Sequence, residues 1–200
     1  MIHVFDIDGT LLDSMPMWNR LPLELLSRHG IDIAPGSEEA EAIFRKIDPI
    51  TSEQGAAWIA ETYLNGKTDE AGNPVTGAAA YREMTDYLTV QYNEILQPFP
   101  DTLDTLRGLH EAGETIVAFS STDAPLLQMA FTRLGISDWF KAIYTTPEIG
   151  YNKVSPMAFA EVAKREGVTP EDMIVYEDSD FAIAAATLAG CLVINCSHEQ

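Results

Sequence analysis

Cysteine is scarce in this sequence, and the scarcity bears on both its fold and its compartment. Two of the 200 residues are cysteine, and Cys191 and Cys196 lie five positions apart along an expected strand. An odd spacing along a strand directs two side chains to opposite faces, so a disulfide between them would break the strand. We therefore expect two unpaired core thiols in a reducing compartment.

Basic residues are also few. Lysine and arginine number 12 against 31 aspartate and glutamate residues, which gives a formal net charge of −19. A chain this acidic repels a phosphate backbone and has few cations to displace its counterions, so nucleic acid is excluded as a partner. We interpret the acidity as favouring solubility and assign it no other role.

Long apolar runs are missing as well. The uncharged stretch 181–197 is too short to cross a bilayer and is interrupted by Gly190 and Asn195. The amino terminus has no basic segment and enters an apolar strand at once, so we expect no cleaved signal peptide. Together with the cysteine usage, these features predict a cytoplasmic protein with no membrane partner.

The sequence does contain a regular alternation of apolar strands and helices, which is typical of a parallel sheet. We expect strands near residues 2–6, 115–119, 142–145, 173–176 and 191–195. The helices that glycine closes are expected at 101–113, 122–135, 155–167 and 180–190. This pattern predicts an α/β fold built on a doubly wound parallel sheet, a Rossmann-like core.

Residues 14–97 interrupt that alternation. They lack a strand pattern and instead show helical spacing of apolar residues, as at Tyr81 and Met84. We therefore predict two domains: a catalytic core formed by residues 1–13 and 98–200, and a small all-helical cap of about four helices inserted into it.

The position of this insert predicts how it acts. It leaves the core just after Asp13 and returns near Pro98, so two hinges are expected to place it over the end of the first strand. There it would close over a substrate and exclude water. We interpret Trp18, Trp58 and the tyrosines of the insert as packing residues.

Two acidic residues directly follow the first strand. Asp6 and Asp8 end the apolar segment 2–5, and the period of a strand projects both carboxylates to the same side. The turn at Gly9 and Thr10 exposes backbone N–H groups that can receive an anion. One carboxylate can act as a nucleophile while the other transfers a proton. Taken alone, an ordinary turn accounts for these residues equally well.

Hydroxyl groups and a lysine follow later strands. The strand 115–119 leads into Ser120 and Ser121, whose hydroxyl and N–H groups can hold phosphate oxygens at the start of a helix. Lys153 stands just before Ser155, a good helix N-cap, and its charge would neutralise a bound anion. A strand end with serine and a surface lysine are the simpler interpretations of each feature by itself.

A second acidic pair closes the strand 173–176. Glu177 and Asp178 offer the carboxylate oxygens that hard cations prefer, although acids are also common at the start of a helix. Open α/β sheets bind their ligands outside the carboxyl ends of the strands. The order of these segments, each at a strand end, therefore predicts one common site.

The chain thereby resembles the haloacid dehalogenase-like (HAD) phosphatase superfamily, whose four motifs match residues 6–10, Ser120, Lys153 and 177–178. The resemblance covers the predicted core and is closest to the β-phosphoglucomutase and phosphoglycolate phosphatase types. The lysine motif usually reads Gly-Lys-Pro, whereas here Asn152 precedes Lys153 and Val154 follows it.

The resemblance implies a role for each matching residue. Asp6 is implied as the nucleophile that forms an aspartyl phosphate, and Asp8 as the general acid and then the general base. Ser120 and Lys153 would bind the transferring phosphoryl group, assisted by the N–H group of Ser121.

A magnesium ion is implied by the same resemblance. Asp178 would hold Mg²⁺ together with the Asp6 carboxylate and the Asp8 backbone carbonyl, and Glu177 would complete the shell directly or through water. The chemistry agrees with this set, because carboxylates crowded together repel one another and have raised pKa values unless a cation lies among them.

These roles predict a Mg²⁺-dependent phosphomonoester hydrolase that acts on a small phosphorylated metabolite. Dehalogenating and phosphonate-cleaving relatives lack an aspartate two residues after the nucleophile, so Asp8 indicates phosphoryl transfer. A sugar phosphomutase of the β-phosphoglucomutase type remains an alternative, because it performs the same first half-reaction. A receiver-like phospho-signalling module has similar residues, but such modules lack an insert of this size after the first strand.

Overall fold

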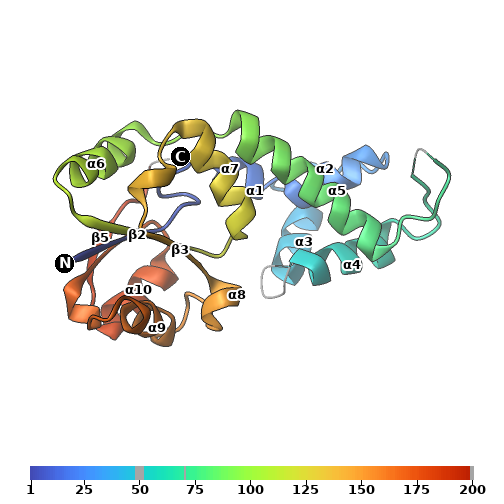
Figure 1. Cartoon of the computed structure of the whole chain (residues 1–200). Coiled ribbons are helices and arrows are strands. Elements are labelled where there is room, and N and C mark those ends of the chain that lie inside the picture. The colour runs from blue at the N-terminus through green and yellow to red at the C-terminus, as the bar shows by residue number, and fades with distance from the viewer. Residues whose placement is uncertain (48–51, 70, 199–200) are drawn as a thin grey trace. The chain divides into compact units, whose positions relative to one another are not determined.

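The structure of the chain is a computed structural model, which describes residues 1–47, 52–69 and 71–198. The chain divides into two compact units (Figure 1). The first unit comprises Met1–Met15 and Gln91–Gln200, and the second unit comprises Pro16–Val90. The domain boundaries expected from the sequence, after Asp13 and before Pro98, stay a prediction.

A parallel sheet forms the centre of the first unit. Its strands are β1 (Ile2–Phe5), β2 (Thr115–Ser120), β3 (Ala142–Thr145), β4 (Met173–Glu177) and β5 (Leu192–Asn195). They lie in the order β3-β2-β1-β4-β5, and each neighbouring pair is parallel. The chain segments that follow β1, β2 and β4 therefore leave the sheet at one edge, where the strand order reverses between β1 and β4.

Helices cover both faces of this sheet, with α9 and α10 on one face and α6 and α7 on the other (Figure 1). These elements and the short turns between them are η1 (Gln91–Ile95, a π-helical turn), α6 (Pro100–Glu111), α7 (Ala124–Leu134), η2 (Ser137–Trp139), α8 (Thr146–Ile149), α9 (Pro156–Glu166), η3 (Pro170–Asp172) and α10 (Asp180–Ala189). The predicted α/β fold with a doubly wound parallel sheet is confirmed.

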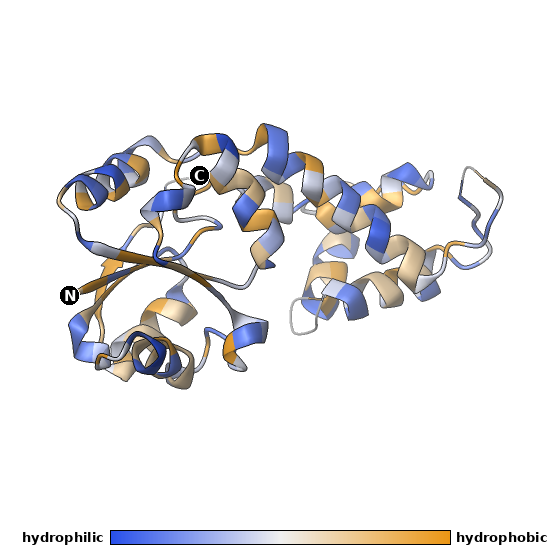
Figure 2. Cartoon of the chain, in the orientation of Figure 1, coloured by the Kyte–Doolittle hydropathy of each residue, from blue (hydrophilic) through white to orange (hydrophobic). Residues whose placement is uncertain are grey.

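The apolar residues of β1, β2 and β4 explain why the centre of the sheet is buried. Val4, Val117 and Val175 from three neighbouring strands pack against Phe159 of α9 and Ala182 of α10 in one buried cluster. The strands accordingly form a hydrophobic centre in Figure 2. Parallel strands covered by helices on both faces require such continuous apolar runs.

The helix ends follow the local signals of the sequence. The Ser155 hydroxyl accepts the Met157 N–H at the start of α9, with Pro156 in the first turn. The same helix ends at Gly167, whose φ of +74° is a left-handed conformation that glycine adopts without strain. Cys191 and Cys196 are both unpaired, as predicted.

The second unit is helical. Following the short α1 (Met15–Trp18), which begins at the boundary, it contains α2 (Leu21–Arg28), α3 (Glu38–Ile47), α4 (Ser52–Tyr63) and α5 (Gly77–Val90). The predicted helical insertion after β1 is thus confirmed. Along the described ranges, the chain has no helix of the length and apolarity that a membrane crossing requires.

Candidate active site

The Asp6 carboxylate lies directly beyond β1, at the centre of the sheet. The Asp6 N–H donates to the Tyr176 carbonyl at 2.9 Å, and the residue is 6% exposed. Lys153 Nζ lies 2.5 Å from Asp6 Oδ1. The other oxygen, Oδ2, is buried and has no hydrogen-bond partner among the described residues. A buried carboxylate oxygen without a partner is costly, so this atom indicates a ligand.

Lys153 is held between two acidic side chains. Its Nζ also donates to Glu177 Oε2 at 2.8 Å, and the Lys153 and Glu177 side chains are almost fully buried. The second Glu177 oxygen accepts the Ser179 N–H at 3.2 Å. Glu177 therefore orients the lysine that faces Asp6. The side-chain oxygen of Asn152, Oδ1, accepts the Lys153 N–H at 2.9 Å.

Burial and neighbouring charges together set the protonation of these groups. It raises the pKa of Asp6 to about 7, against the opposing effect of Lys153. Burial works to lower the pKa of Lys153, but the charges of Asp6 and Glu177 keep that pKa above its usual value. The pKa of Asp178 is raised, first by burial and then by the charge of Asp6. A cation close to Asp6 and Asp178 would favour their ionised forms.

The carboxylates suit such a cation. Asp6, Glu177 and Asp178 each offer an oxygen, and the three atoms lie within 4.8 Å of one another. Oxygen donors of this kind are what Mg²⁺ prefers. The partnerless Asp6 Oδ2 is one of the atoms available to it, whereas both oxygens of Glu177 already have partners in the protein.

The turn after Asp8 holds Asp178 in place. Thr10 Oγ1 donates to Asp178 Oδ1 at 3.0 Å. Gly9 has a φ of +94°, and a Cβ atom added there would lie 2.4 Å from Asp178 Oδ2. The turn can therefore pack against this carboxylate only because residue 9 is glycine.

Asp8 has a different environment from Asp6. Its Oδ1 accepts the Ser14 hydroxyl at 2.7 Å and the Tyr92 hydroxyl at 2.5 Å. Its Oδ2 accepts the Ser120 hydroxyl at 3.4 Å, and Ser120 Oγ in turn accepts the Thr122 N–H at 3.0 Å. The structure thus brings Ser120 to Asp8. Every one of these side chains belongs to the first unit.

The remaining predicted residue, Ser121, follows Ser120 in the bend after β2, where it is exposed. All seven residues predicted for the site thus lie at the carboxyl ends of β1, β2 and β4 or in the segment before α9. The side chains of the other six form two groups. Asp6, Lys153, Glu177 and Asp178 lie together in the first group, and Asp8 and Ser120 form the second.

Two partners of Asp8 were missed by the sequence analysis. Ser14 lies six residues after Asp8, and a serine so close to a candidate acid is a usable signal. Tyr92 lies 84 residues after Asp8, and it belongs to the tyrosines interpreted as packing residues. Local patterning does not distinguish it from the others, because its contact arises only when the chain folds.

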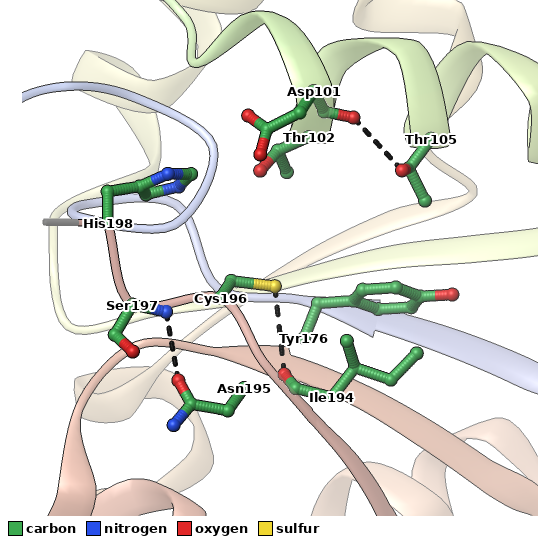
Figure 3. A pocket seen from close by; sticks show the side chains of 9 residues that line it. All are labelled: Asp101, Thr102, Thr105, Tyr176, Ile194, Asn195, Cys196, Ser197 and His198. Carbon is green, nitrogen blue, oxygen red and sulfur yellow. Dashed lines mark hydrogen bonds between the residues drawn. The ribbon is translucent and has the colours of Figure 1, made fainter.

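A separate pocket lies in the first unit between α6 and the ends of β4 and β5 (Figure 3). It has a volume of about 350 Å³ and is lined by Asp101, Thr102, Thr105, Tyr176, Ile194, Asn195, Cys196, Ser197 and His198. None of the predicted site residues lines it.

Comparison with known proteins identifies the family of the chain. A family model of haloacid dehalogenase-like hydrolases matches residues 2–190. Hexitol phosphatase B of Escherichia coli strain K12 is 24% identical over 188 residues, which are 93% of this chain and 78% of that protein. The fructose-1-phosphate phosphatase of the same strain is 27% identical over 188 residues, which are 94% of this chain and 91% of that protein.

A similar fold occurs in a solved structure. The crystal structure of β-phosphoglucomutase from Clostridium difficile matches 98% of this chain and 84% of its own, with a TM-score of 0.69 and 23% identity. At this identity the match supports the fold alone. The matched family model covers nearly the whole sequence, and the curated relatives are phosphatases. The chain belongs to the haloacid dehalogenase-like hydrolase family and is a phosphatase of that family.

Proposed function

We propose that this phosphatase hydrolyses the monoester of a small phosphorylated sugar or related metabolite through an aspartyl phosphate on Asp6. The observation that carries the proposal is the environment of that side chain, which has Lys153 on Oδ1 and no protein partner on the buried Oδ2 among the residues described. The substrate class is supported by relatives named for hexitol, fructose 1-phosphate and phosphoglycolate.

The first half-reaction transfers the phosphoryl group to the enzyme. A carboxylate oxygen of Asp6 attacks phosphorus while the bond to the ester oxygen breaks, and Asp8 gives its proton to that oxygen. Lys153 neutralises charge on the transferring group. The Ser120 hydroxyl and the Ser121 N–H donate to its outer oxygens.

The second half-reaction returns the enzyme to its starting state. Asp8, now ionised, takes a proton from a water molecule whose oxygen attacks the phosphorus of the aspartyl phosphate. The bond between phosphorus and Asp6 breaks, inorganic phosphate leaves, and Asp8 is protonated again. The same residue therefore serves as acid and then as base.

Asp6 and Asp178, with the Asp8 backbone carbonyl, are the proposed ligands of Mg²⁺. Because both Glu177 oxygens are engaged by Lys153 and the Ser179 N–H, we assign Glu177 to this site through a water molecule. When bound, the ion would neutralise charge on the phosphate oxygens and polarise the phosphoryl group. It would also keep Asp6 ionised, against the burial that raises the pKa of this residue to about 7.

The test is phosphate release from a panel of sugar, polyol and small organic phosphates, with Mg²⁺ and with EDTA. We expect Mg²⁺-dependent release that is lost in Asp6→Asn and kept in Asp13→Asn, which removes one exposed carboxylate nearby in sequence. Absence of release from the folded wild type would contradict the proposal.

Two other outcomes have specific meanings. Conversion of a hexose 1-phosphate to its isomer without free phosphate would identify a phosphomutase. A long-lived aspartyl phosphate without turnover would identify a signalling module.

A further inference from the structure

We infer that Tyr92 is a positioning residue for Asp8, which fixes one carboxylate oxygen so that the other carries the transferred proton. The inference rests on the proposed function, in which Asp8 is the general acid and base. It extends that function by assigning separate tasks to Oδ1 and Oδ2 of the same carboxylate.

The hydrogen bonds divide the two oxygens clearly. The Tyr92 and Ser14 hydroxyls both reach Oδ1, at 2.5 Å and 2.7 Å. An oxygen that already accepts hydrogen bonds from two hydroxyl groups has little room to bind a proton of its own. Asp8 Oδ2 accepts the Ser120 hydroxyl at the longer distance of 3.4 Å, on the side proposed to hold the phosphoryl group. The proton delivered to the leaving oxygen therefore sits on Oδ2.

Tyr92 is better suited than Ser14 to fix this geometry. The Ser14 hydroxyl also lies 3.4 Å from the Leu12 carbonyl, so its proton has a second acceptor. Tyr92 is fully buried in the π-helical turn η1. Arg133 of α7 holds this turn by donating from Nε to the Tyr92 carbonyl at 3.2 Å and from a terminal nitrogen to the Leu96 carbonyl. A buried aromatic ring on a fixed turn loses little freedom when it makes its hydrogen bond.

The two donors also occupy special places in the chain. Ser14 stands just before the first connection to the second unit, and Tyr92 stands just after the second connection. Asp8 is thus held by both segments through which the insert is joined to the first unit. π-helical turns such as η1 are frequent at functional sites.

The experiment compares Tyr92→Phe with the wild type on esters of different leaving groups. An alkyl phosphate, the best substrate from the panel, needs a proton on its ester oxygen as the bond to phosphorus breaks. In 4-nitrophenyl phosphate the leaving phenolate is stable without one. kcat/KM covers the steps up to formation of the aspartyl phosphate, so it isolates the half-reaction in which Asp8 is the acid.

We expect Tyr92→Phe to lower kcat/KM for the alkyl phosphate by about tenfold to a hundredfold and for 4-nitrophenyl phosphate by less than about threefold. Tyr144→Phe is the matched control, because it removes a tyrosine hydroxyl that donates to the Glu166 carboxylate at 2.7 Å in the same unit. This control should change neither value.

Equal losses on both substrates, or no loss on either, would overturn the inference. The latter result, with an active wild type and an inactive Asp6→Asn, would leave the proposed function intact. If Asp6→Asn retained activity, the proposed function itself would be wrong. Thermal unfolding of Tyr92→Phe shows whether a loss of activity reflects misfolding. A merely structural role of Tyr92 would lower kcat/KM for both substrates by the same factor.

Discussion

The two compact units differ in the kind of side chain that they bury. Within the described residues, the buried ion-paired residues Asp6, Lys153 and Glu177 all belong to the first unit, whereas in the second unit the His29 side chain, 8% exposed, lies against Glu83. The second unit buries apolar side chains such as Leu25 and Ile59. Buried charges cost free energy unless they are paired, whereas buried aliphatic groups stabilise directly. The first unit therefore gives up stability to build a site, and the second unit does not.

This difference predicts where a mutation should change both the activity and the free energy of unfolding. In the first unit, the side chains proposed to act in catalysis are also ion-paired with one another. Replacing one of them therefore leaves a buried charge without its partner. In the second unit a core substitution should alter stability through packing alone. The following experiments sharpen or break this contrast.

The largest effect is expected from Lys153→Met. It removes the cation from between Asp6 and Glu177 and leaves two buried carboxylates without it. We expect phosphate release to fall at least about a hundredfold. The free energy of unfolding should drop by about 3–5 kcal/mol, as measured by urea titration. Lys164→Met, which breaks an exposed pair with Glu161, should cost less than about 1 kcal/mol and leave activity unchanged.

The second experiment is Ile59→Ala in α4. Ile59 is fully buried in the second unit, so its truncation should lower the free energy of unfolding by about 2–5 kcal/mol. The Mg²⁺ affinity of the folded protein should not change, because the acidic cluster lies entirely in the first unit. Calorimetric titration with Mg²⁺ checks this. A weakened affinity would break the contrast between the units.

The third experiment concerns pH. Burial raises the pKa of Asp6 from 3.8 to about 7, so between these values the folded protein holds a proton that the unfolded chain has lost. The free energy of unfolding of the metal-free protein should then fall as pH rises through this window. Asp6→Asn removes the titrating group and should flatten the slope. Urea titrations in EDTA at pH 5 and pH 8 measure the difference, and parallel slopes would contradict it.

The sequence predicted most of the fold because the strand and helix signals are local. Apolar runs bounded by turn residues placed β1 to β4 closely, and Ser155 and Pro156 marked the start of α9. The candidate site followed from topology, since parallel strands that end in polar residues present them at one edge. Lys153, which lies in the segment before α9 and 147 residues from Asp6, was assigned to the same site through the resemblance to the family.

Side-chain pairing was beyond such reasoning. Glu177 and Asp178 are neighbouring acids in the sequence, yet Glu177 accepts a hydrogen bond from Lys153 and Asp178 accepts one from the Thr10 hydroxyl. Which acid faces which partner depends on the alternation of side chains at the end of β4 and on packing around it. The Tyr92 contact with Asp8 likewise depends on where the chain returns from the second unit.

The smallest change to the chain tests the site most directly. Gly9→Ala and Gly36→Ala each place a Cβ on a backbone with positive φ, at +94° in the first unit and +75° in the second. Both should lower the free energy of unfolding by about 1 kcal/mol or more. At Gly36 nothing described lies within 4 Å of the added atom, whereas at Gly9 it would meet Asp178 Oδ2 at 2.4 Å.

The two alanine variants should therefore differ in their affinity for Mg²⁺. Displacing Asp178 should weaken binding at least about tenfold in Gly9→Ala, while Gly36→Ala should bind Mg²⁺ like the wild type. Calorimetric titration separates the effects, because backbone strain is common to both variants and the clash with a carboxylate is not. Equal affinities would mean that Asp178 is not a ligand, and Mg²⁺ would then have to be held by Asp6, the Asp8 backbone carbonyl and, through water, Glu177.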